Sequence, residues 1–235
     1  MSLTRKFLPV FALVAAAFTA TPALADPITL TAASVGQSYT FNMNGFNGTT
    51  TVAGLTSTLT LTLQSVADTA YTFGYNLANT TSAPLTSRVT GFGFNTDPDI
   101  GGAAATGTFQ YVMTNINVPN GIGAVDVALN SGCLSSCSGS GVAAGNTGLG
   151  TLTLAFCDPI TSLTLDNFFV RYQSITGAGG ITSGNGVPTT GTTTGGTTGG
   201  TEVPEPGMLG MMGGALIALA WARTRRRAPA KLAAA

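Results

Sequence analysis

The strict alternation of threonine and leucine in residues 58–63 constrains the fold of this chain more than any other feature. A period of two places the leucines on one face and the threonines on the other, which is the pattern of a half-buried β-strand. The same alternation recurs in residues 151–156 and 163–165. At least part of the core is therefore expected to be built from strands.

Other runs rich in β-branched and aromatic residues bring the expected number to about nine short strands. These runs are residues 28–31, 39–43, 71–77, 88–94, 108–113 and 124–129. Turn formers lie among them, namely Asn44-Gly45, Asn47-Gly48, Asp97-Pro98, Pro119-Asn120-Gly121 and Ser131-Gly132. No stretch between the termini has a sustained helical period. The sequence predicts an all-β fold, an antiparallel β-sandwich or jelly-roll-like domain.

The N-terminus has the features of a secretory signal. Arg5 and Lys6 precede the apolar stretch 7–20, and Ala23-Leu24-Ala25 has the small-x-small pattern of a signal peptidase site. Residues 1–25 are therefore predicted to be a signal peptide with a helical apolar core, removed by signal peptidase before Asp26. The mature protein is expected to leave the cytoplasm.

A compositional change marks the end of the predicted domain. Residues 177–202 consist almost entirely of glycine and threonine, with one proline at position 188. Such a segment has too little apolar surface to offset the entropy of folding. The sequence therefore predicts a β domain over residues 26–176 and a flexible linker over residues 177–202.

The charge of the predicted domain limits its partners. Residues 26–176 contain two arginines, seven aspartates and no lysine, a net charge of −5. Binding to a phosphate backbone requires clustered lysine and arginine, so a nucleic acid partner is excluded. The predicted surface is instead rich in hydroxyl and amide groups.

The C-terminal residues read as a sorting signal in three parts. Its proline-rich segment is Val203, Pro204, Glu205 and Pro206, and its basic cluster is Arg223, Arg225, Arg226 and Arg227. Between them, the apolar run 207–222 forms a helix of about 24 Å that can enter a bilayer. Because arginines remain on the cytoplasmic side, the β domain is expected outside the cytoplasm. A short tail, residues 228–235, follows.

The order of these three parts resembles the PEP-CTERM protein-sorting domain over residues 203–227. The resemblance implies that an exosortase, a membrane-embedded cysteine peptidase of Gram-negative bacteria, removes the tail near Pro204-Glu205-Pro206. It further implies an inner-membrane intermediate, followed by display on the cell surface or release, in organisms that make exopolysaccharide. A permanent single-pass membrane anchor is the alternative.

The body resembles the cistern family of PEP-CTERM proteins in two patches. The first comprises Ser82-Ala83-Pro84 and residues 87–98, and the second comprises residues 165–168 and 170–174. The role of that family is undefined, so this resemblance implies no activity.

Residue types argue against an enzyme. The chain contains no histidine, which removes the commonest base for a hydroxyl or thiol nucleophile and the usual nitrogen ligand of zinc. The predicted domain contains no glutamate, so paired carboxylates of a glycosidase would have to come from its seven aspartates. We expect no catalytic residues and no cofactor.

Three cysteines allow more than one pairing. Cys133 and Cys137 lie close together in a Ser/Gly-rich segment, and an exported protein meets an oxidising environment, so a local disulfide between them is expected. Cys157 is then left over, on the outward face with Thr151 and Thr153. Pairing of Cys157 with either other cysteine, or between two chains, remains open.

Two binding hypotheses remain beside a purely structural role. Asn95, Asp97 and Asp99 offer alternate oxygens of the kind that hold calcium, although a β-turn explains the same residues and no metal site is predicted. The row Thr58, Thr60 and Thr62, with Thr151 and Thr153 as a second row, would suit ice binding if the rows were neighbours. A carbohydrate-binding face needs exposed aromatic residues, and the tyrosines are scattered through the sequence. They are Tyr39, Tyr71, Tyr75, Tyr111 and Tyr172.

Taken together, the residues and the sorting resemblance predict an exported, non-enzymatic surface or extracellular-matrix protein that an exosortase processes, associated with exopolysaccharide. The alternatives are a carbohydrate-, calcium- or ice-binding module and a permanently membrane-anchored structural protein.

Overall fold

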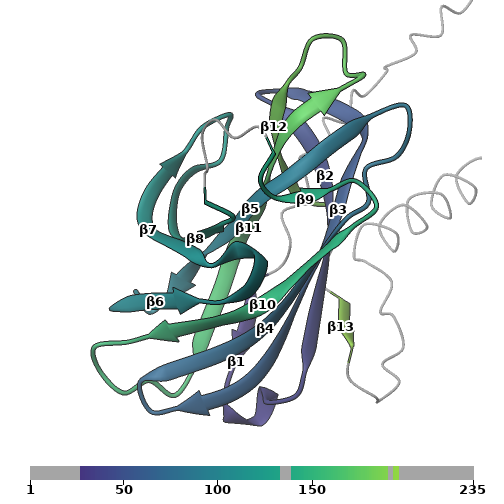
Figure 1. Cartoon of the computed structure of the whole chain (residues 1–235). Helices are drawn as coiled ribbons and strands as arrows, with labels where there is room; N and C mark the ends of the chain where they lie inside the picture. The colour runs from purple at the N-terminus through teal and green to yellow at the C-terminus, as the bar shows by residue number, and fades with distance from the viewer. Residues whose placement is uncertain (1–26, 133–138, 190–192, 196–235) are drawn as a thin grey trace, which may run out of the picture. The chain divides into compact units, whose positions relative to one another are not determined.

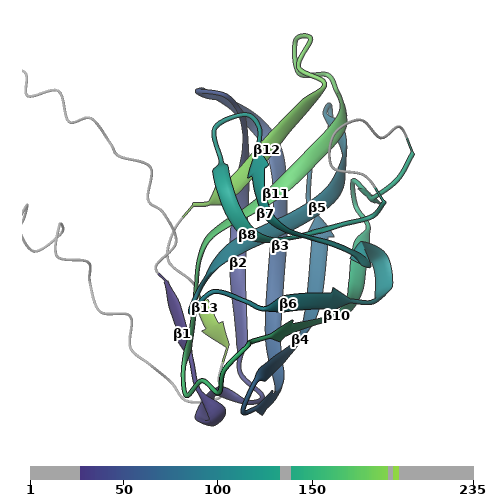
Figure 2. The same cartoon turned by 90° about the vertical axis from the view of Figure 1, so that its left-hand side faces the viewer.

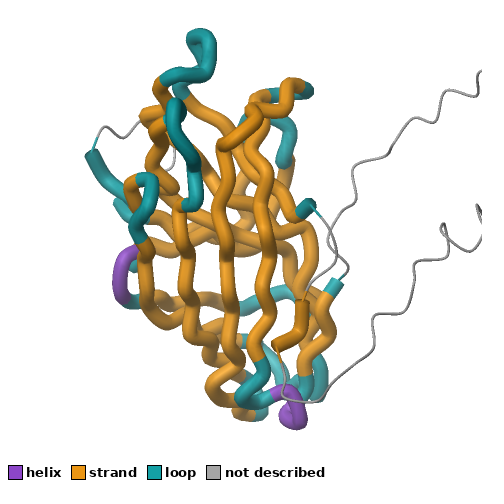
Figure 3. The backbone as a smooth tube through the Cα atoms, turned by 90° about the vertical axis from the view of Figure 1, so that its right-hand side faces the viewer, coloured by secondary structure: helices purple, strands orange, loops and turns teal. Residues whose placement is uncertain are grey.

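The computed structural model describes residues 27–132, 139–189 and 193–195. The all-β prediction is confirmed, because strands make up most of the described backbone (Figure 3). The helical segments within these ranges are two 3-10 turns, η1 (Ala32–Ser34) and η2 (Gly107–Phe109). Within the same ranges, no helix has the length and apolarity needed to cross a membrane. The expected signal and transmembrane helices lie outside the described residues.

Every predicted strand overlaps a strand of the structure, and four further strands are present. The strands are β1 (Ile28–Leu30), β2 (Ser38–Asn47), β3 (Thr50–Ala67), β4 (Ala70–Asn79), β5 (Thr86–Asp97), β6 (Gly102–Ala105), β7 (Tyr111–Val118), β8 (Gly123–Asn130), β9 (Val142–Ala143), β10 (Thr147–Ala155), β11 (Leu163–Thr176), β12 (Ser183–Pro188) and β13 (Thr193–Gly195). The sequence missed β6, β9, β12 and β13, which are short or rich in glycine and alanine.

The strands form one hydrogen-bonded sheet in the order β6-β10-β4-β3-β2-β12-β11-β5-β8-β7. Each pairing among the described strands is antiparallel. The two ends of this path, β6 and β7, follow each other in the chain through η2, so the sheet nearly closes on itself (Figure 2). The two layers expected for a sandwich are therefore two halves of a single sheet.

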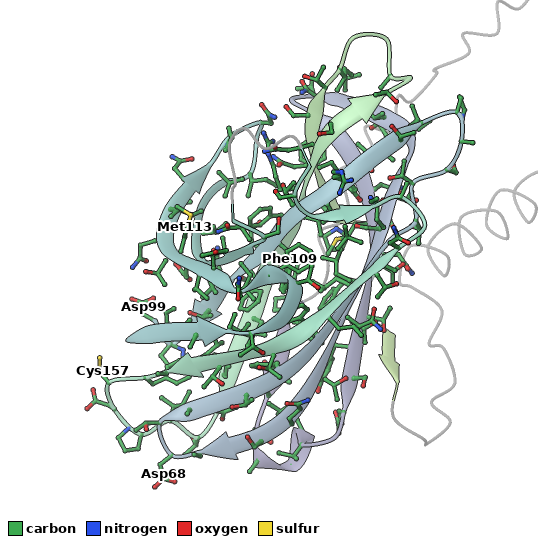
Figure 4. The ribbon with its side chains drawn as sticks, in the orientation of Figure 1. Asp68, Asp99, Phe109, Met113 and Cys157 are labelled. Carbon is green, nitrogen blue, oxygen red and sulfur yellow. The ribbon has the colours of Figure 1, made fainter. Side chains whose placement is uncertain are left out.

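Buried aromatic side chains contribute to the core between the two halves of the sheet, whose strands are labelled in Figure 1. Phe41 on β2 stacks on Phe168 on β11 with ring centroids 4.0 Å apart. Tyr75 on β4 meets Phe92 on β5 edge to face at 5.3 Å. Phe109 from η2 completes this cluster and points into the interior (Figure 4). The contact of Tyr75 with Phe92 joins strands that are far apart in the order of the sheet, so it helps to hold the fold closed.

The central strand β3 follows the alternation that the sequence predicted. Leu59, Leu61 and Leu63 are fully buried, while the threonines between them are half-buried on the outer face. Each fully buried leucine contributes about 1.5–3 kcal/mol relative to an exposed one. The pattern specifies the register of β3, because a shift by one residue would exchange the two faces.

Two of the predicted turns have different outcomes in the structure. Pro119-Asn120-Gly121 lies in the turn between Val118 of β7 and Gly123 of β8, with positive φ at Asn120 and Gly121, a conformation that asparagine and glycine adopt more readily than other residues. Asn44-Gly45 is not a turn. It lies inside β2, where the register with β3 shifts between Asn44 and Phe46 and a side chain at Gly45 would collide with Leu55. The turn prediction at that position is wrong.

The predicted linker also needs correction. Residues 183–188 form β12, which pairs with β11 on one side and with β2 on the other. Its glycines permit close packing, since a Cβ on Gly186 would lie 2.8 Å from the ring of Tyr172. Glycine therefore serves the sheet here, and the folded part of the chain extends beyond Thr176.

The buried hydroxyl of Tyr172 predicts a loss of stability at alkaline pH. Tyr172 is buried, and its hydroxyl donates a hydrogen bond to Ser57 Oγ over 2.7 Å. Burial raises the pKa of Tyr172 far above its ordinary value, and the hydrogen bond to Ser57 opposes this shift only in part. Burial also raises the pKa of Tyr71 and Tyr75. These groups stabilise the fold fully below about pH 10, where tyrosines of the unfolded chain are still protonated.

Above about pH 10 the unfolded chain releases protons that the folded chain retains, so the free energy of unfolding falls. We expect the melting temperature to decline there and the ultraviolet absorbance of tyrosinate to rise together with unfolding. The variant Tyr172→Phe should lose about 1–2 kcal/mol at neutral pH, because Ser57 loses its partner. It should also decline less steeply above about pH 10. An equally steep decline in the variant would contradict the assignment to Tyr172.

Candidate functional site

The outer surface of β2 and β3 carries an uncharged set of hydroxyl and amide side chains, here called the hydroxyl face. It consists of Ser38, Thr40, Asn42, Thr58, Thr60 and Thr62. The register places these residues in pairs across the two strands, and each pair is hydrogen-bonded. The distances are 2.7 Å for Ser38 and Thr62, 3.0 Å for Thr40 and Thr60, and 3.2 Å for Thr58 and Asn42.

The second threonine row predicted from the sequence is not adjacent to this face. Strand β4 lies between β3 and β10, so Thr151 and Thr153 are separated from the hydroxyl face by Gly74 and Thr72 of β4. Thr151 and Thr153 bond instead to Thr106 and Thr72, at 2.8 and 3.1 Å. These hydroxyl groups are mainly hydrogen-bonded to one another, and the two threonine rows do not form a continuous array.

A groove of about 490 Å³ adjoins the hydroxyl face where β2 turns into β3. We call it the Phe46 groove. It is lined by residues of β2, the β2–β3 turn, β3, the β7–β8 turn and β12, among them Asn44, Phe46, Thr51, Gly121, Val187 and Thr189. Segments far apart in the sequence meet here, because β12 pairs with β2 and the β7–β8 turn reaches over β12.

The half-buried ring of Phe46 lies at the centre of these contacts. Phe46 is opposite Thr51 in β3 and opposite Asn185 in β12. Gly121 approaches the ring from the β7–β8 turn, since a Cβ on Gly121 would lie 3.6 Å from it. The positive φ of Gly121 also favours glycine at this position. The groove thus combines the accessible aromatic ring of Phe46 with the backbone of Gly121, which carries no side chain.

Two part-buried hydrogen bonds hold the walls of the groove. Asn47 Nδ2 donates to the carbonyl oxygen of Ser183 over 2.8 Å, which ties the β2–β3 turn to β12. Asn185 Nδ2 donates to the carbonyl oxygen of Pro119 over 2.6 Å, which ties the β7–β8 turn to β12. The groove is therefore formed by fixed elements and does not depend on a free loop.

Arg171 lies beneath this end of the sheet and supports Asn185. Its guanidinium is buried and donates from one terminal nitrogen to Asn185 Oδ1 at 3.1 Å and to the Gly184 carbonyl at 3.4 Å. Burial lowers the pKa of Arg171. Its Nε has no hydrogen-bond partner among the described residues. The contacts assign Arg171 the role of orienting Asn185, and so the β7–β8 turn.

The groove itself is uncharged, because none of its ten lining residues is ionisable. The exposed acidic residues lie elsewhere. Asp68 follows the end of β3 remote from the groove, and Asp99 lies at that same end of the domain (Figure 4). A ligand in the groove would meet hydroxyl, amide and backbone groups around one aromatic ring.

The three residues of the calcium hypothesis have different surroundings in the structure. Asn95 Oδ1 accepts a hydrogen bond from the backbone nitrogen of Asp126, and Asp126 Oδ2 accepts one from the backbone nitrogen of Thr96. Asp97 and Asp99 are exposed. Over the part of the chain that the structure describes, no three histidine, cysteine or acidic residues are grouped to hold a metal ion.

The remaining sequence predictions concern the cysteines, the tyrosines and the two terminal signals. Cys157 is exposed, but β10 ends at Ala155, so its exposure does not come from the outward face of that strand. Four tyrosines, Tyr39, Tyr71, Tyr75 and Tyr172, are buried, whereas Tyr111 is 54 % exposed on β7. Cys133, Cys137, the signal peptide and the sorting residues from Val203 to Arg227 lie outside the described residues. The tyrosines therefore form no common sugar-binding face.

Sequence reasoning did not find Phe46. An available signal was its position between Asn44-Gly45 and Asn47-Gly48, since an aromatic residue beside a hairpin turn is often outside the core. The turn interpretation of Asn44-Gly45 concealed it, because that interpretation ended β2 too early. Phe46 lies on the same side of β2 as Asn44, because the two are two residues apart, and Asn44 is opposite Val187 in β12.

Comparison with known proteins bears on the C-terminal region. The family model of the PEP-CTERM protein-sorting motif matches residues 202–227. No curated protein and no solved structure matches the chain.

Proposed function

From the PEP-CTERM motif, which marks this chain as an exosortase-sorted extracellular protein, we propose that it is a non-enzymatic component of the cell surface or extracellular matrix, associated with exopolysaccharide. The motif is the observation that carries this proposal. The chain passes through the inner membrane before it reaches the surface or the medium.

The sorting motif supplies the residues for processing. Pro204, Glu205 and Pro206 serve as the recognition element for the exosortase, and the arginines at 223 and 225–227 keep the end of the tail in the cytoplasm. Signal peptidase removes residues 1–25 at the other end. The displayed protein then consists of the β domain and the residual segment before the motif.

The residue types of the chain and of the groove support a non-enzymatic role. The chain contains no histidine, and it has only nine acidic residues in total. Of the carboxylates in the described domain, Asp126 is engaged with the backbone of Thr96 across β5 and β8. The described residues that line the groove offer no nucleophile, acid or base stronger than a hydroxyl or amide group.

Association with polysaccharide is supported by the surface chemistry. The hydroxyl face and the Phe46 groove present uncharged hydrogen-bonding groups, which can exchange water for the hydroxyl groups of a sugar polymer.

The proposal is tested by intact mass after fractionation into cytoplasm, membranes, surface matrix and medium. The expected species begins at Asp26, ends near Pro204 and is found in the surface matrix. In a strain unable to make exopolysaccharide, the same processed species should move from the matrix fraction to the medium. A chain that retains its tail through Ala235 in the inner membrane would support the alternative of a permanent anchor.

A further inference from the structure

We propose that the Phe46 groove binds a neutral sugar residue of a linear glycan, with the pyranose ring lying against Phe46. The inference rests on the proposed association with polysaccharide and assigns the residues that make the contact. Phe46 is the one aromatic residue among the described residues that line this groove, so the proposal depends on a single side chain.

The first step of the argument is the shape of the groove. Its volume of about 490 Å³ is within the range of small-molecule pockets, and its walls are held by the hydrogen bonds of Asn47 and Asn185. A preformed site does not lose affinity through the ordering of loops on binding. The groove is open on the outer surface, as a site for one unit of a long polymer must be.

The second step is the chemistry of the lining. One face of a pyranose ring presents C–H groups, which pack well against an aromatic ring such as Phe46. The edges of a sugar carry hydroxyl groups, which both donate and accept hydrogen bonds. Asn44 supplies an amide and Thr51 a hydroxyl group, both exposed beside the ring. This combination of one apolar surface and several neutral polar groups matches a sugar better than an aliphatic or ionic ligand.

The third step is charge. Among its lining residues the groove has no lysine or arginine to pair with a carboxylate or phosphate group. The domain also carries a net charge of −5 over residues 26–176, which disfavours an anionic ligand. The observations therefore favour a neutral glycan over a uronic-acid polymer.

The fourth step is the direction of the polymer. Asn44 in the groove and Asn42 in the hydroxyl face point to the same side of β2, because they are two residues apart. Thr56 and Thr58 continue the same surface on β3. A glycan bound at Phe46 can thus extend along the strands over further hydroxyl and amide groups. In this arrangement the Phe46 groove holds one sugar unit, and the adjoining hydroxyl face contacts the units that follow.

Binding by the processed protein is the test, measured by calorimetry and by the NMR signals of the Phe46 ring. The probes are cellotetraose, maltotetraose and mannotetraose as neutral glycans, tetragalacturonate as the acidic control, and purified exopolysaccharide of the producing cells. At least one neutral probe and the polysaccharide are expected to bind and to shift the Phe46 signals. Tetragalacturonate is expected not to bind.

The variants separate the groove from the rest of the surface. Phe46→Ala and Asn44→Ala should each weaken binding by about tenfold or more, while Phe46→Tyr retains it. Tyr111→Ala is the matched control, because Tyr111 is an exposed aromatic residue on β7 outside the groove. Circular dichroism melting verifies that each variant is folded. Asn44 is exposed, so Asn44→Ala provides a test even if Phe46→Ala fails to fold.

The outcomes distinguish the two proposals. If the polysaccharide binds equally to the wild-type protein and to both alanine variants, or without shifting the Phe46 signals, the groove is not the site and the matrix association stands. A groove occupied by the chain's own segment after Thr189 would give this result. If the wild-type protein binds no probe and no polysaccharide, the matrix association fails and the groove proposal fails with it. Equal binding of tetragalacturonate would overturn the assignment to neutral glycans.

Discussion

A chain that begins at Asp26 and ends at Thr176 is expected to remain unfolded, whereas one that ends at Gly196 folds and melts cooperatively. The shorter chain has the boundaries that composition alone predicts for the domain. It lacks β12, which occupies an interior position in the sheet between β11 and β2. This prediction has the largest expected effect on stability.

The physical reason is the loss of two strand pairings at once. Removing β12 exposes the backbone hydrogen-bonding groups of Val170 to Gln173 on β11 and of Met43 to Phe46 on β2. It also removes Asn185, which holds the β7–β8 turn and accepts a hydrogen bond from Arg171. Arg171 would then lose its side-chain partner. We expect a loss of more than about 5 kcal/mol, which is comparable with the whole stability of an ordinary domain.

Circular dichroism and thermal melting of the two chains provide the measurement. A third chain, with residues 177–182 intact and residues 183–188 replaced by a Gly/Ser sequence of equal length, separates the loss of β12 from the effect of shortening. It should behave as the chain that ends at Thr176. Equal melting temperatures for the chains that end at Thr176 and Gly196 would show that β12 contributes little to the fold.

Replacement of Pro204, Glu205 and Pro206 by alanines is expected to abolish processing. The two prolines restrict the backbone to extended conformations and lack N–H donors, while Glu205 places a carboxylate between them. Alanines remove all three properties and permit the helix predicted for the following apolar run to extend backward. The unprocessed chain should accumulate in the membrane fraction with its tail intact, and the processed species should disappear.

A matched control replaces Thr197, Thr198 and Thr201 by alanines, which changes three nearby residues outside the motif. This control is expected to be processed as the wild-type chain is, and intact mass distinguishes the two products. Normal maturation of the variant without Pro204, Glu205 and Pro206 would end the role assigned to these residues. The β domain should melt at the same temperature in both variants, since neither changes a described residue.

The strands were predictable where the pattern of side chains was strong. β3 and β10 carry alternating leucines, and burial of one face is sufficient to produce a strand at each. The four missed strands have weak local signals. β6 is largely alanine, and β12 contains two glycines in six residues, so their conformation depends on the neighbours with which they pair.

The groove could not be predicted in the same way, because its residues come from distant parts of the sequence. Phe46, Gly121 and Val187 are brought together by the pairing of β12 with β2 and by the bond from Asn185 to Pro119. Local sequence indicates neither contact. Nor does it indicate the register shift between β2 and β3, which places Thr51 opposite Phe46.

The sequence by itself determined the all-β class, the positions of the main strands and the sorting motif. Each of these depends on residues that are close together in the chain. The strands follow from the period of the side chains, and the sorting motif follows from the order of short segments. Only the tertiary structure decided that the two layers belong to one sheet, that a Gly/Thr-rich segment supplies an interior strand and that Phe46 lies in an uncharged groove. Those results depend on which distant strands meet, since the free energy of pairing and packing belongs to the contact and not to either segment alone.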